Sequence, residues 1–372
     1  MAGASYNGTM ALDLPSTWPL LTADLPGIGG QVKVDPDDFE VEELPAYEPS
    51  GSGDHLYLWV AKRDMGAEFF LREVARALGL AMGDVGMAGV KDRRAVTRQW
   101  ISVPAGCSDR VPALAERGIL VEKQARHTNK LRTGHLIGNR FTVRLRGVAA
   151  ETAERLPPLL ERLRQGGFPN YYGEQRFGRD GETLAVGLKL LQGERLPAAQ
   201  RFLRKMALSA VQSVLFNHVL ARRLTEGLLH QVLPGDLMRH WPRGGHFVVE
   251  DAAREQARFD AHQIVTTGPM FGVKMQQPGG PVAEREAAVL AAAGLALPSF
   301  AGFGGLLQGT RRPLVCFVDD LSWEMADADA VLRFTLPAGS YATVLLDEIR
   351  KASDSTPEGA SEASDARVEQ RE

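Results

Sequence analysis

The sequence predicts an α+β fold built from two domains, and three features of the chain support this. The chain has 372 residues, more than one small hydrophobic core usually holds. Hydrophobic residues make up 44% and charged residues 24%, as in ordinary soluble globular enzymes. Alternating, strand-like patterns dominate both ends of the chain, whereas helical periodicity dominates the middle. The simplest topology is a helical domain inserted into a sheet domain.

The first 148 residues are typical of strands around one helix. QVKVDPDDFEVEEL (31–44) predicts two short strands around a Pro-Asp turn, and HLYLWVAKR (55–63) predicts a third strand. Apolar residues at helical spacing in EFFLREVARALGL (68–80) predict a helix that ends at Gly79. Further strands are predicted for RQWISV (98–103), ILVEKQAR (119–126) and NRFTVRLRGV (139–148).

From residue 150 onward the pattern becomes helical. ETAERLPPLLERLRQGG (151–167) is helical apart from its prolines, and FPNYYGEQRFGRDGET (168–183) is typical of a loop. Helices are predicted within 184–193, 201–229 and 285–295. VLRFTLPAGSYATVLLDEI (331–349) returns to a strand, a turn and a helix.

The net charge of −3 does not by itself indicate a nucleic-acid binder, but the charges are unevenly distributed. The segment 352–372 has six acids and two bases, so it carries −4 and the rest of the chain +1. Its Ser, Ala and Gly content predicts a disordered tail. By contrast, 121–146 has seven bases and one acid. This basic stripe is either a solvated strand face or a track for a phosphate backbone.

Several enzyme and targeting signatures are missing from the sequence. There is no GxxxxGK[ST], no GxGxxG near the chain start, no GxSxG, and no HxxxH or HxH pair. We therefore expect neither a metal nor a nucleotide cofactor. Two distant cysteines, no charged leader and no apolar run long enough for a bilayer favour a cytoplasmic protein without a membrane segment.

The stretch GVKDRRAVTRQW (89–100) contains the main candidate for chemistry. Asp92 is its single carboxylate, and a hydroxyl and an amide, Thr97 and Gln99, follow. Four cationic side chains surround Asp92, namely Lys91, Arg93, Arg94 and Arg98. Asp92 is then either half of a surface ion pair, contributing at most about 1 kcal/mol, or a carboxylate that takes part in a reaction.

Five blocks in order decide between these alternatives. They are VDPDDFEVEE (34–43), AGVKDRRAVTRQWISV (88–103), GHLIGNRF (134–141), FPNYYGEQRFG (168–178) and LPAGSYATVLL (336–346). Together they resemble the tRNA pseudouridine synthase D (TruD) family over nearly the whole chain. The resemblance implies a pseudouridine synthase catalytic domain with a mixed or antiparallel sheet and an inserted, helix-rich TRUD-type domain. The implied segments are an N-terminal extension (1–30), the catalytic domain (31–166 and 317–351), the insertion (167–316) and the acidic tail (352–372).

The resemblance also implies roles for single residues. Asp92 is the catalytic carboxylate, Phe141 stacks on the extruded uracil, and Asn139 hydrogen-bonds nearby. Phe39 matches another pocket position, and Tyr341 stands where the family usually has Phe. Lys33 and Lys91 are candidates for charges near Asp92 or a phosphate, and the cations assigned to the RNA backbone are Lys123, Arg126, Lys130 and Arg132. Without the resemblance, Phe39 and Phe141 are typical strand core residues, and Asn139 is typical of a turn.

The implied reaction converts uridine to pseudouridine, at position 13 of certain tRNAs, without cofactor, metal or obligate protein partner. A C–N glycosidic bond breaks and a C–C bond forms, which needs a carboxylate to attack uracil or ribose, or to abstract a proton. The base must also be turned out of its helix. Two alternatives remain: a tRNA-binding or RNA-chaperone protein with little or no catalysis, and a hydrolase that pairs Asp92 with a second carboxylate, which the sequence does not offer nearby.

Overall fold

The structure is a computed structural model that describes residues 12, 14–197, 200–318 and 320–351. The chain divides into two units. The sheet unit comprises 25–164, 318–342 and the chain from 349, and the helix-rich unit comprises the chain up to 24, 165–317 and 343–348. The predicted acidic tail and most of residues 1–13 lie outside the described residues.

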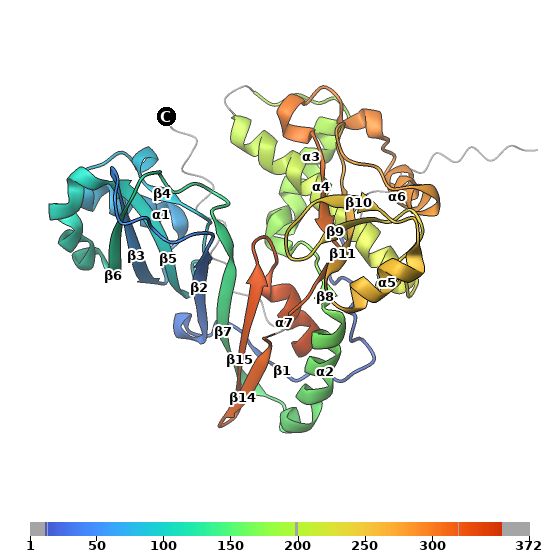
Figure 1. Ribbon diagram of the computed structural model, residues 1–372, viewed down its shortest axis with the longest axis horizontal. Coiled ribbons are helices and arrows are strands. Elements are labelled where there is room, and N and C mark those ends of the chain that lie inside the picture. The colour runs from blue at the N-terminus through green and yellow to red at the C-terminus, as the bar shows by residue number, and fades with distance from the viewer. Residues whose placement is uncertain (1–11, 13, 198–199, 319, 352–372) are drawn as a thin grey trace, which may run out of the picture. The chain divides into compact units, whose positions relative to one another are not determined.

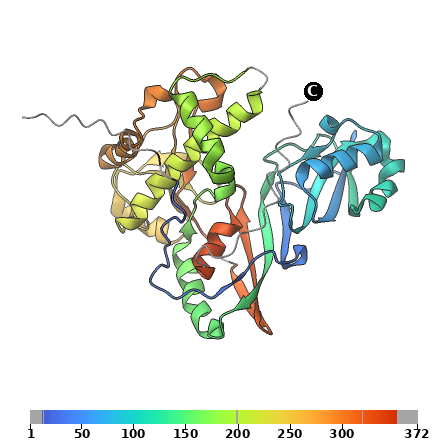
Figure 2. The same cartoon turned by 180° about the vertical axis from the view of Figure 1, so that it is seen from behind.

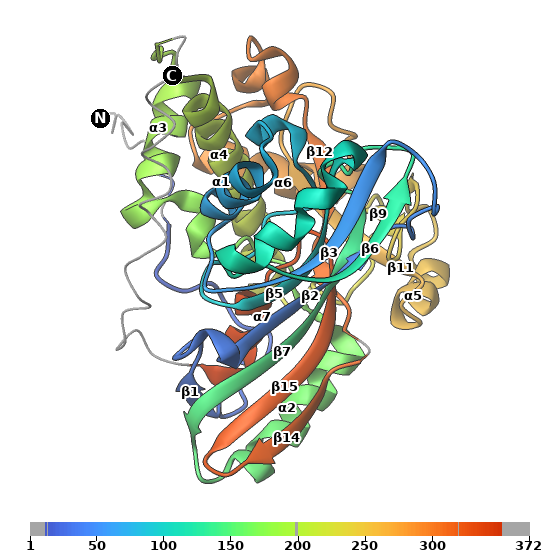
Figure 3. The same ribbon diagram turned by 90° about the vertical axis from the view of Figure 1, so that its left-hand side faces the viewer.

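The sheet unit is organised around one large sheet. Its strands are β1 (Gly29–Gln31), β2 (Phe39–Pro45), β3 (His55–Arg63), β4 (Gly86–Met87), β5 (Val96–Pro104), β6 (Leu120–His127), β7 (Leu136–Val148), β14 (Ser322–Ala326) and β15 (Asp329–Pro337). In the described chain they pair in the order β14-β15-β7-β2-β5-β3-β6, with β1 added to β7 and β4 to β5 (Figures 1 and 3). The β2–β5 pair is parallel and the other pairs are antiparallel, so the predicted mixed sheet is confirmed.

One face of β3 and β5 is covered by α1 (Ala67–Leu78) and by a run of 3-10 turns, η3 (Ala105–Arg117) (Figure 2). Phe70, Val74 and Leu78 of α1 are fully buried in this core. The helix ends as predicted at Gly79, whose φ of 64° lies in the left-handed region that glycine adopts at low cost.

Helix α2 (Thr152–Gly166) continues through Pro157 and Pro158, although the sequence pattern suggested an interruption there. Four leucines on one side of the helix are fully buried: Leu156, Leu159, Leu160 and Leu163. The buried apolar side offsets the backbone hydrogen bonds that the prolines cannot donate. The helix lies behind β14 and β15 in the view of Figure 3.

The first predicted strand, around Val32 and Val34, is not formed. Strand β1 ends at Gln31, and Lys33 has a φ of 55° that interrupts an extended chain. Asp35 then caps a 3-10 turn, η1 (Pro36–Asp38), by accepting a hydrogen bond from the backbone N–H of Asp37. Local capping by a short carboxylate therefore prevails over the alternating pattern.

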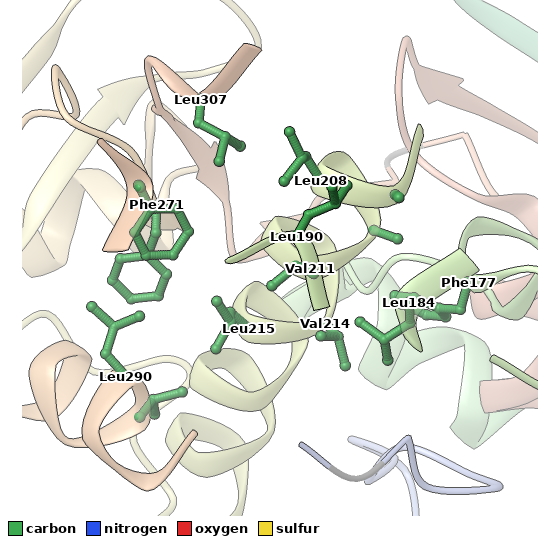
Figure 4. Close-up of a cluster of buried hydrophobic side chains, with 14 of the residues drawn as sticks. Phe177, Leu184, Leu190, Leu208, Val211, Val214, Leu215, Phe271, Leu290 and Leu307 are labelled. Atoms are coloured by element: carbon green, nitrogen blue, oxygen red, sulfur yellow. The ribbon is translucent and has the colours of Figure 1, made fainter. Parts of the chain in front are cut away.

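The helix-rich unit contains α3 (Glu182–Leu191), α4 (Arg201–Thr225), α5 (Ala252–Asp260) and α6 (Gly280–Ala292). Figure 4 shows its core, in which Val211, Val214 and Leu215 of α4 pack among residues of α3 and α6. A C-terminal helix, α7 (Ala342–Arg350), follows β15 in the chain.

This unit also contains a sheet that the sequence pattern did not predict. Its strands pair in the order β10 (His246–Val248), β9 (Leu237–His240), β11 (Ile264–Met270) and β12 (Thr310–Pro313). Two further short strands, β8 (Phe168–Pro169) and β13 (Val315–Cys316), pair with each other. Every residue of β11 is buried, so it lacks the alternation that identifies a half-exposed strand.

Gly138 of β7 permits the close approach of β15. A Cβ atom at this position would lie 2.1 Å from the backbone oxygen of Leu336. We expect Gly138→Ala to lower the free energy of unfolding by about 3 kcal/mol, the upper part of the usual range for overpacking. The matched control is Gly106→Ala, whose added Cβ meets no atom within 4 Å. Urea denaturation of both variants tests this, and equal stabilities would contradict it.

Candidate active site

Asp92 lies in the loop between β4 and β5, where its carboxylate meets an ammonium. Its Oδ2 atom is 3.0 Å from Nζ of Lys33, and the two side chains are 33% and 18% exposed. The same Nζ lies 4.4 Å from the centre of the Phe39 ring. Lys33, which has the left-handed backbone conformation, therefore contacts both the carboxylate of Asp92 and the ring of Phe39.

Lys91 is buried in the sheet unit, where it pairs with a carboxylate other than Asp92. Its Nζ lies 2.6 Å from Oε2 of Glu43, with side-chain exposures of 3% and 0%. The backbone N–H of Trp100 donates to the other Glu43 oxygen at 3.3 Å. Burial raises the pKa of Glu43, and the charge of Lys91 opposes that rise. Breaking such a buried pair by removing one partner typically costs about 3–5 kcal/mol, so this pair fixes the loop next to Asp92.

Phe141 is the middle ring of three. It stacks on Phe334 of β15 at 5.2 Å between ring centres and meets the edge of Phe39 at 5.9 Å. Phe141 is 7% exposed and Phe39 is fully buried. The structure therefore brings Asp92, Lys33, Phe39 and Phe141 together, with Phe39 linking the ion pair to the other rings.

Asn139 lies on the same face of the sheet as Phe141 and Glu43, because it is two residues from Phe141 on β7 and pairs directly with Glu43 of β2. Its Oδ1 atom is buried and accepts no hydrogen bond from any described residue. Tyr341 is half-buried and lies directly before α7, four residues after Pro337, which pairs with Gly138.

The basic stripe separates into two groups. Three of its arginines form ion pairs: Arg140 with Glu42, Arg144 with Asp329, and Arg146 with Asp38 and Asp329. Two of the residues predicted to contact the RNA backbone donate to backbone oxygens, Arg126 to Gly53 and Lys130 to Gly83. Unlike these three arginines, the four predicted residues pair with no carboxylate in the described chain: Lys123, Arg126, Lys130 and Arg132. Two of them lie on β6, an edge strand separated from β2 by β5 and β3.

Four buried polar residues of β2, β3 and β5 were given no role from the sequence. They are Glu43, Lys62, Thr97 and Gln99, each at most 3% exposed. Thr97 and Gln99 follow Asp92 closely in the sequence, but nothing indicated burial. Oγ1 of Thr97 and Nε2 of Gln99 have no hydrogen-bond partner among the described residues. Burial lowers the pKa of Lys62 to about 8, the charge of Asp92 opposes this, and Lys91 adds to it.

The arrangement has the chemical parts of a site for a carboxylate reaction. Asp92 is a partly exposed carboxylate held by the ammonium of Lys33, and the same unit contains two buried lysines, Lys62 and Lys91. Aromatic rings and an amide oxygen without a partner lie on the same face of the sheet. Such a carboxylate can attack as a nucleophile or accept a proton, and rings and amides can hold a planar base. In the described ranges, no three His, Cys, Asp or Glu side chains converge as metal ligands would.

A family model and known relatives that match this chain all carry the same family name. The family model described as tRNA pseudouridine synthase D (TruD) matches residues 18–203 and 194–349. The chain is 45% identical over 345 residues to tRNA pseudouridine synthase D of Anaeromyxobacter dehalogenans strain 2CP-C, covering 91% of this chain and 98% of the relative. It is 41% identical over 341 residues to a protein of the same name from Thermus thermophilus, covering 91% and 93%.

A crystal structure with the same family designation, from Methanosarcina mazei, superimposes with a TM-score of 0.72 at 25% identity. The match covers 89% of this chain and 96% of that one. Among the described residues, no helix has both the length and the apolar character needed to cross a membrane.

The three-ring cluster provides a test. We expect Phe141→Ala to lower the free energy of unfolding by about 3–5 kcal/mol, because the ring is packed between two others. If Phe141 also stacks on the extruded base, the folded variant loses a further 1–3 kcal/mol or so of transition-state stabilisation. The control is Ile137→Ala on the same strand, at a side chain that is 45% exposed.

Denaturation curves and single-turnover rates separate the two effects. A destabilised Phe141→Ala protein whose folded fraction reacts at the normal rate would argue against stacking on the base.

Proposed function

Because the chain belongs to the tRNA pseudouridine synthase D family, we propose that it is an isomerase that converts uridine to pseudouridine in tRNA, at position 13. The family match extends from residue 18 to 349, and the two relatives compared above are named for this activity. The reaction rearranges the nucleotide without a net redox change, so its balance needs no redox cofactor.

One observation supports catalysis best: the contact between Asp92 and Lys33 beside the buried Lys91–Glu43 pair. A protein that kept an RNA-binding surface but lost catalysis has no reason to retain a half-buried Lys33–Asp92 pair next to a buried Lys91–Glu43 pair, because burying charge is costly. The RNA-chaperone alternative is therefore not favoured. A hydrolase would need a second reacting carboxylate, and two buried ones in the sheet unit are already paired, Glu43 with Lys91 and Asp38 with Arg146.

We assign the catalytic role to the carboxylate of Asp92. Attack on uracil, attack on ribose and proton abstraction from the sugar all use the same carboxylate and the same neighbouring cation. Lys33 fixes the carboxylate at 3.0 Å and supplies positive charge where the extruded nucleotide carries phosphate. Lys91 acts through its pair with Glu43, by holding the loop in place.

The base-binding role is proposed for Phe141, Asn139 and Tyr341, with Phe39 behind them. A flipped uracil offers one N–H donor and two carbonyl acceptors, and the free Oδ1 of Asn139 is suited to accept from the donor. Four cations without carboxylate partners would contact RNA phosphates: Lys123, Arg126, Lys130 and Arg132.

The domain assignment also remains a proposal. The catalytic domain comprises 31–166 and 317–351, and the inserted TRUD-type domain comprises 167–316. These limits lie close to the division between the sheet unit and the helix-rich unit, although 343–348 group with the latter. The cytoplasm, where tRNA is modified, is the proposed location.

The central test is Asp92→Asn. Asn is nearly isosteric but neutral and a poor nucleophile, so the variant should fold, bind tRNA and form no pseudouridine. Unmodified tRNA transcripts are incubated with each protein, and pseudouridine is read by carbodiimide treatment and primer extension. Turnover near the wild-type rate would remove Asp92 from the mechanism. No pseudouridine with the wild-type protein, across a set of tRNAs, would contradict the proposed function.

A second test concerns the basic stripe. Reversing Lys130 and Arg132 to Glu should weaken tRNA binding and reduce the slope of log K against log salt by about 0.7–0.9 for each phosphate that the protein no longer neutralises. The control is reversal of Arg72 and Arg76 on α1, which changes the net charge equally, at arginines that already pair with Glu68 and Glu73. Equal dissociation constants for the two double variants would indicate a solvated face instead.

A further inference from the structure

Lys62 is a buried lysine to which neither the sequence pattern nor the proposed mechanism gives a role. It lies near the end of β3, is 3% exposed, and pairs across the sheet with Thr97 of β5. Its ammonium donates to the backbone oxygen of Met65, and its Nζ lies 5.6 Å from the ring of Phe70 on α1. An ammonium carries three donors, so the Met65 contact leaves hydrogen-bonding capacity unused inside the protein.

The groups around Lys62 indicate which anion can interact with its unused N–H donors. Lys62 pairs with Thr97 of β5, Thr97 with Val41 of β2, and Val41 with Phe141 of β7, so Lys62 lies on the same face of the sheet as Phe141. From the loop before β5, the charges of Asp92 and Lys91 act on Lys62, and from the end of β3 that of Asp64 does so. The neighbours on β5 and α1 are uncharged, a threonine and a phenylalanine. Lys91 is already paired with Glu43, and Asp92 is bound by Lys33 through Oδ2 alone. Asp64 is 48% exposed and pairs with Arg93, whereas Asp92 is 33% exposed, so Asp92 is the less solvated of the two nearby anions and the better partner for a buried ammonium.

We infer that Lys62 is a positioning residue for Asp92, a buried ammonium that faces the carboxylate from β3 while Lys33 holds it from the segment before β2. The inference rests on the proposed role of Asp92. A second cation near one carboxylate favours its charged form and, together with Lys33, restricts its orientation, and a reacting group must be held within fractions of an ångström. Because Lys62 does not reach solvent, its effect on the reaction passes through Asp92.

Keeping Lys62 charged inside the protein costs folding free energy, and a residue with a purely structural role could avoid that cost by being apolar. Burial lowers the pKa of Lys62 from its ordinary 10.5 to about 8. Between these pH values the unfolded chain binds more protons than the folded one, so wild-type stability rises with pH across that window. Below pH 8 the folded protein holds a buried charge. Methionine at this position removes the charge with little change in shape.

The first arm of the test needs no catalysis. Proteins with ¹³C-labelled lysine are titrated by NMR, and the Lys62 signal is identified by its loss in Lys62→Met. In the wild type it should titrate near pH 8, and in Asp92→Asn at lower pH, because the carboxylate that favours the ammonium is gone. An unchanged Lys62 titration in Asp92→Asn would overturn the inference, whether or not the protein makes pseudouridine.

The second arm measures single-turnover pseudouridine formation. Lys62→Met should bind tRNA with an unchanged dissociation constant but react about tenfold more slowly or worse at pH 7. The wild-type rate should fall above about pH 8 as Lys62 loses its proton, and Lys62→Arg, which stays charged, should retain its rate there. The control is Arg63→Gln, the next residue along β3, which is half-exposed and pairs with Asp35 and Asp37.

Thermal denaturation between pH 6 and pH 10 completes the test. Lys62→Met should melt at or above the wild-type temperature below pH 8, with the difference narrowing at higher pH. A Lys62→Met protein that reacts at the wild-type rate, or one that is slow only because it melts early, would assign Lys62 a structural role. If Lys62→Arg fails to fold, the NMR arm and Lys62→Met still decide. Absence of wild-type turnover would contradict the proposed function, and the NMR titration alone would then test the inference about Lys62.

Discussion

The buried ion pair between Lys91 and Glu43 is the interaction on which the geometry of the site depends. It joins a loop to the central strand β2 through two side chains with almost no solvent contact. Asp92 follows Lys91 directly, so the pair limits where its carboxylate can lie. Removing either partner would leave an uncompensated buried charge, which is why this contact constrains the loop more than a surface ion pair could.

Strand β7 provides the second constraint. It pairs with β2 on one side and β15 on the other, and thereby places Asn139 and Phe141 opposite Glu43 and Val41. Since side chains alternate along a strand, both point to one face. The site is thus assembled from neighbouring strands of a single sheet, a rigid support for residues that must be held accurately. The aromatic cluster extends the same face to β15 through Phe334.

Stability and chemistry make opposite demands on this part of the sheet. Glu43, Lys62 and Lys91 are charged or titratable groups in a region that apolar side chains could fill, and two nearby polar atoms, on Thr97 and Gln99, have no partner in the described chain. Each costs folding free energy. The helix α1 and the 3-10 run η3 offset this cost by burying an apolar core against β3 and β5. Charge is thereby retained beside Asp92.

The sequence by itself determined the α+β class, most strands of the large sheet and α1, because these have clear alternation or helical spacing and a glycine stop. Through the ordered blocks it also led to Asp92 as the proposed catalytic carboxylate. Only the tertiary structure decided that Val32–Val34 is not a strand, that α2 passes through two prolines, and that β9 to β12 form a sheet. It also decided that Glu43 and Lys62 are buried beside Asp92. Charged residues in an alternating strand look solvent-facing in sequence, and burial depends on segments distant in the chain.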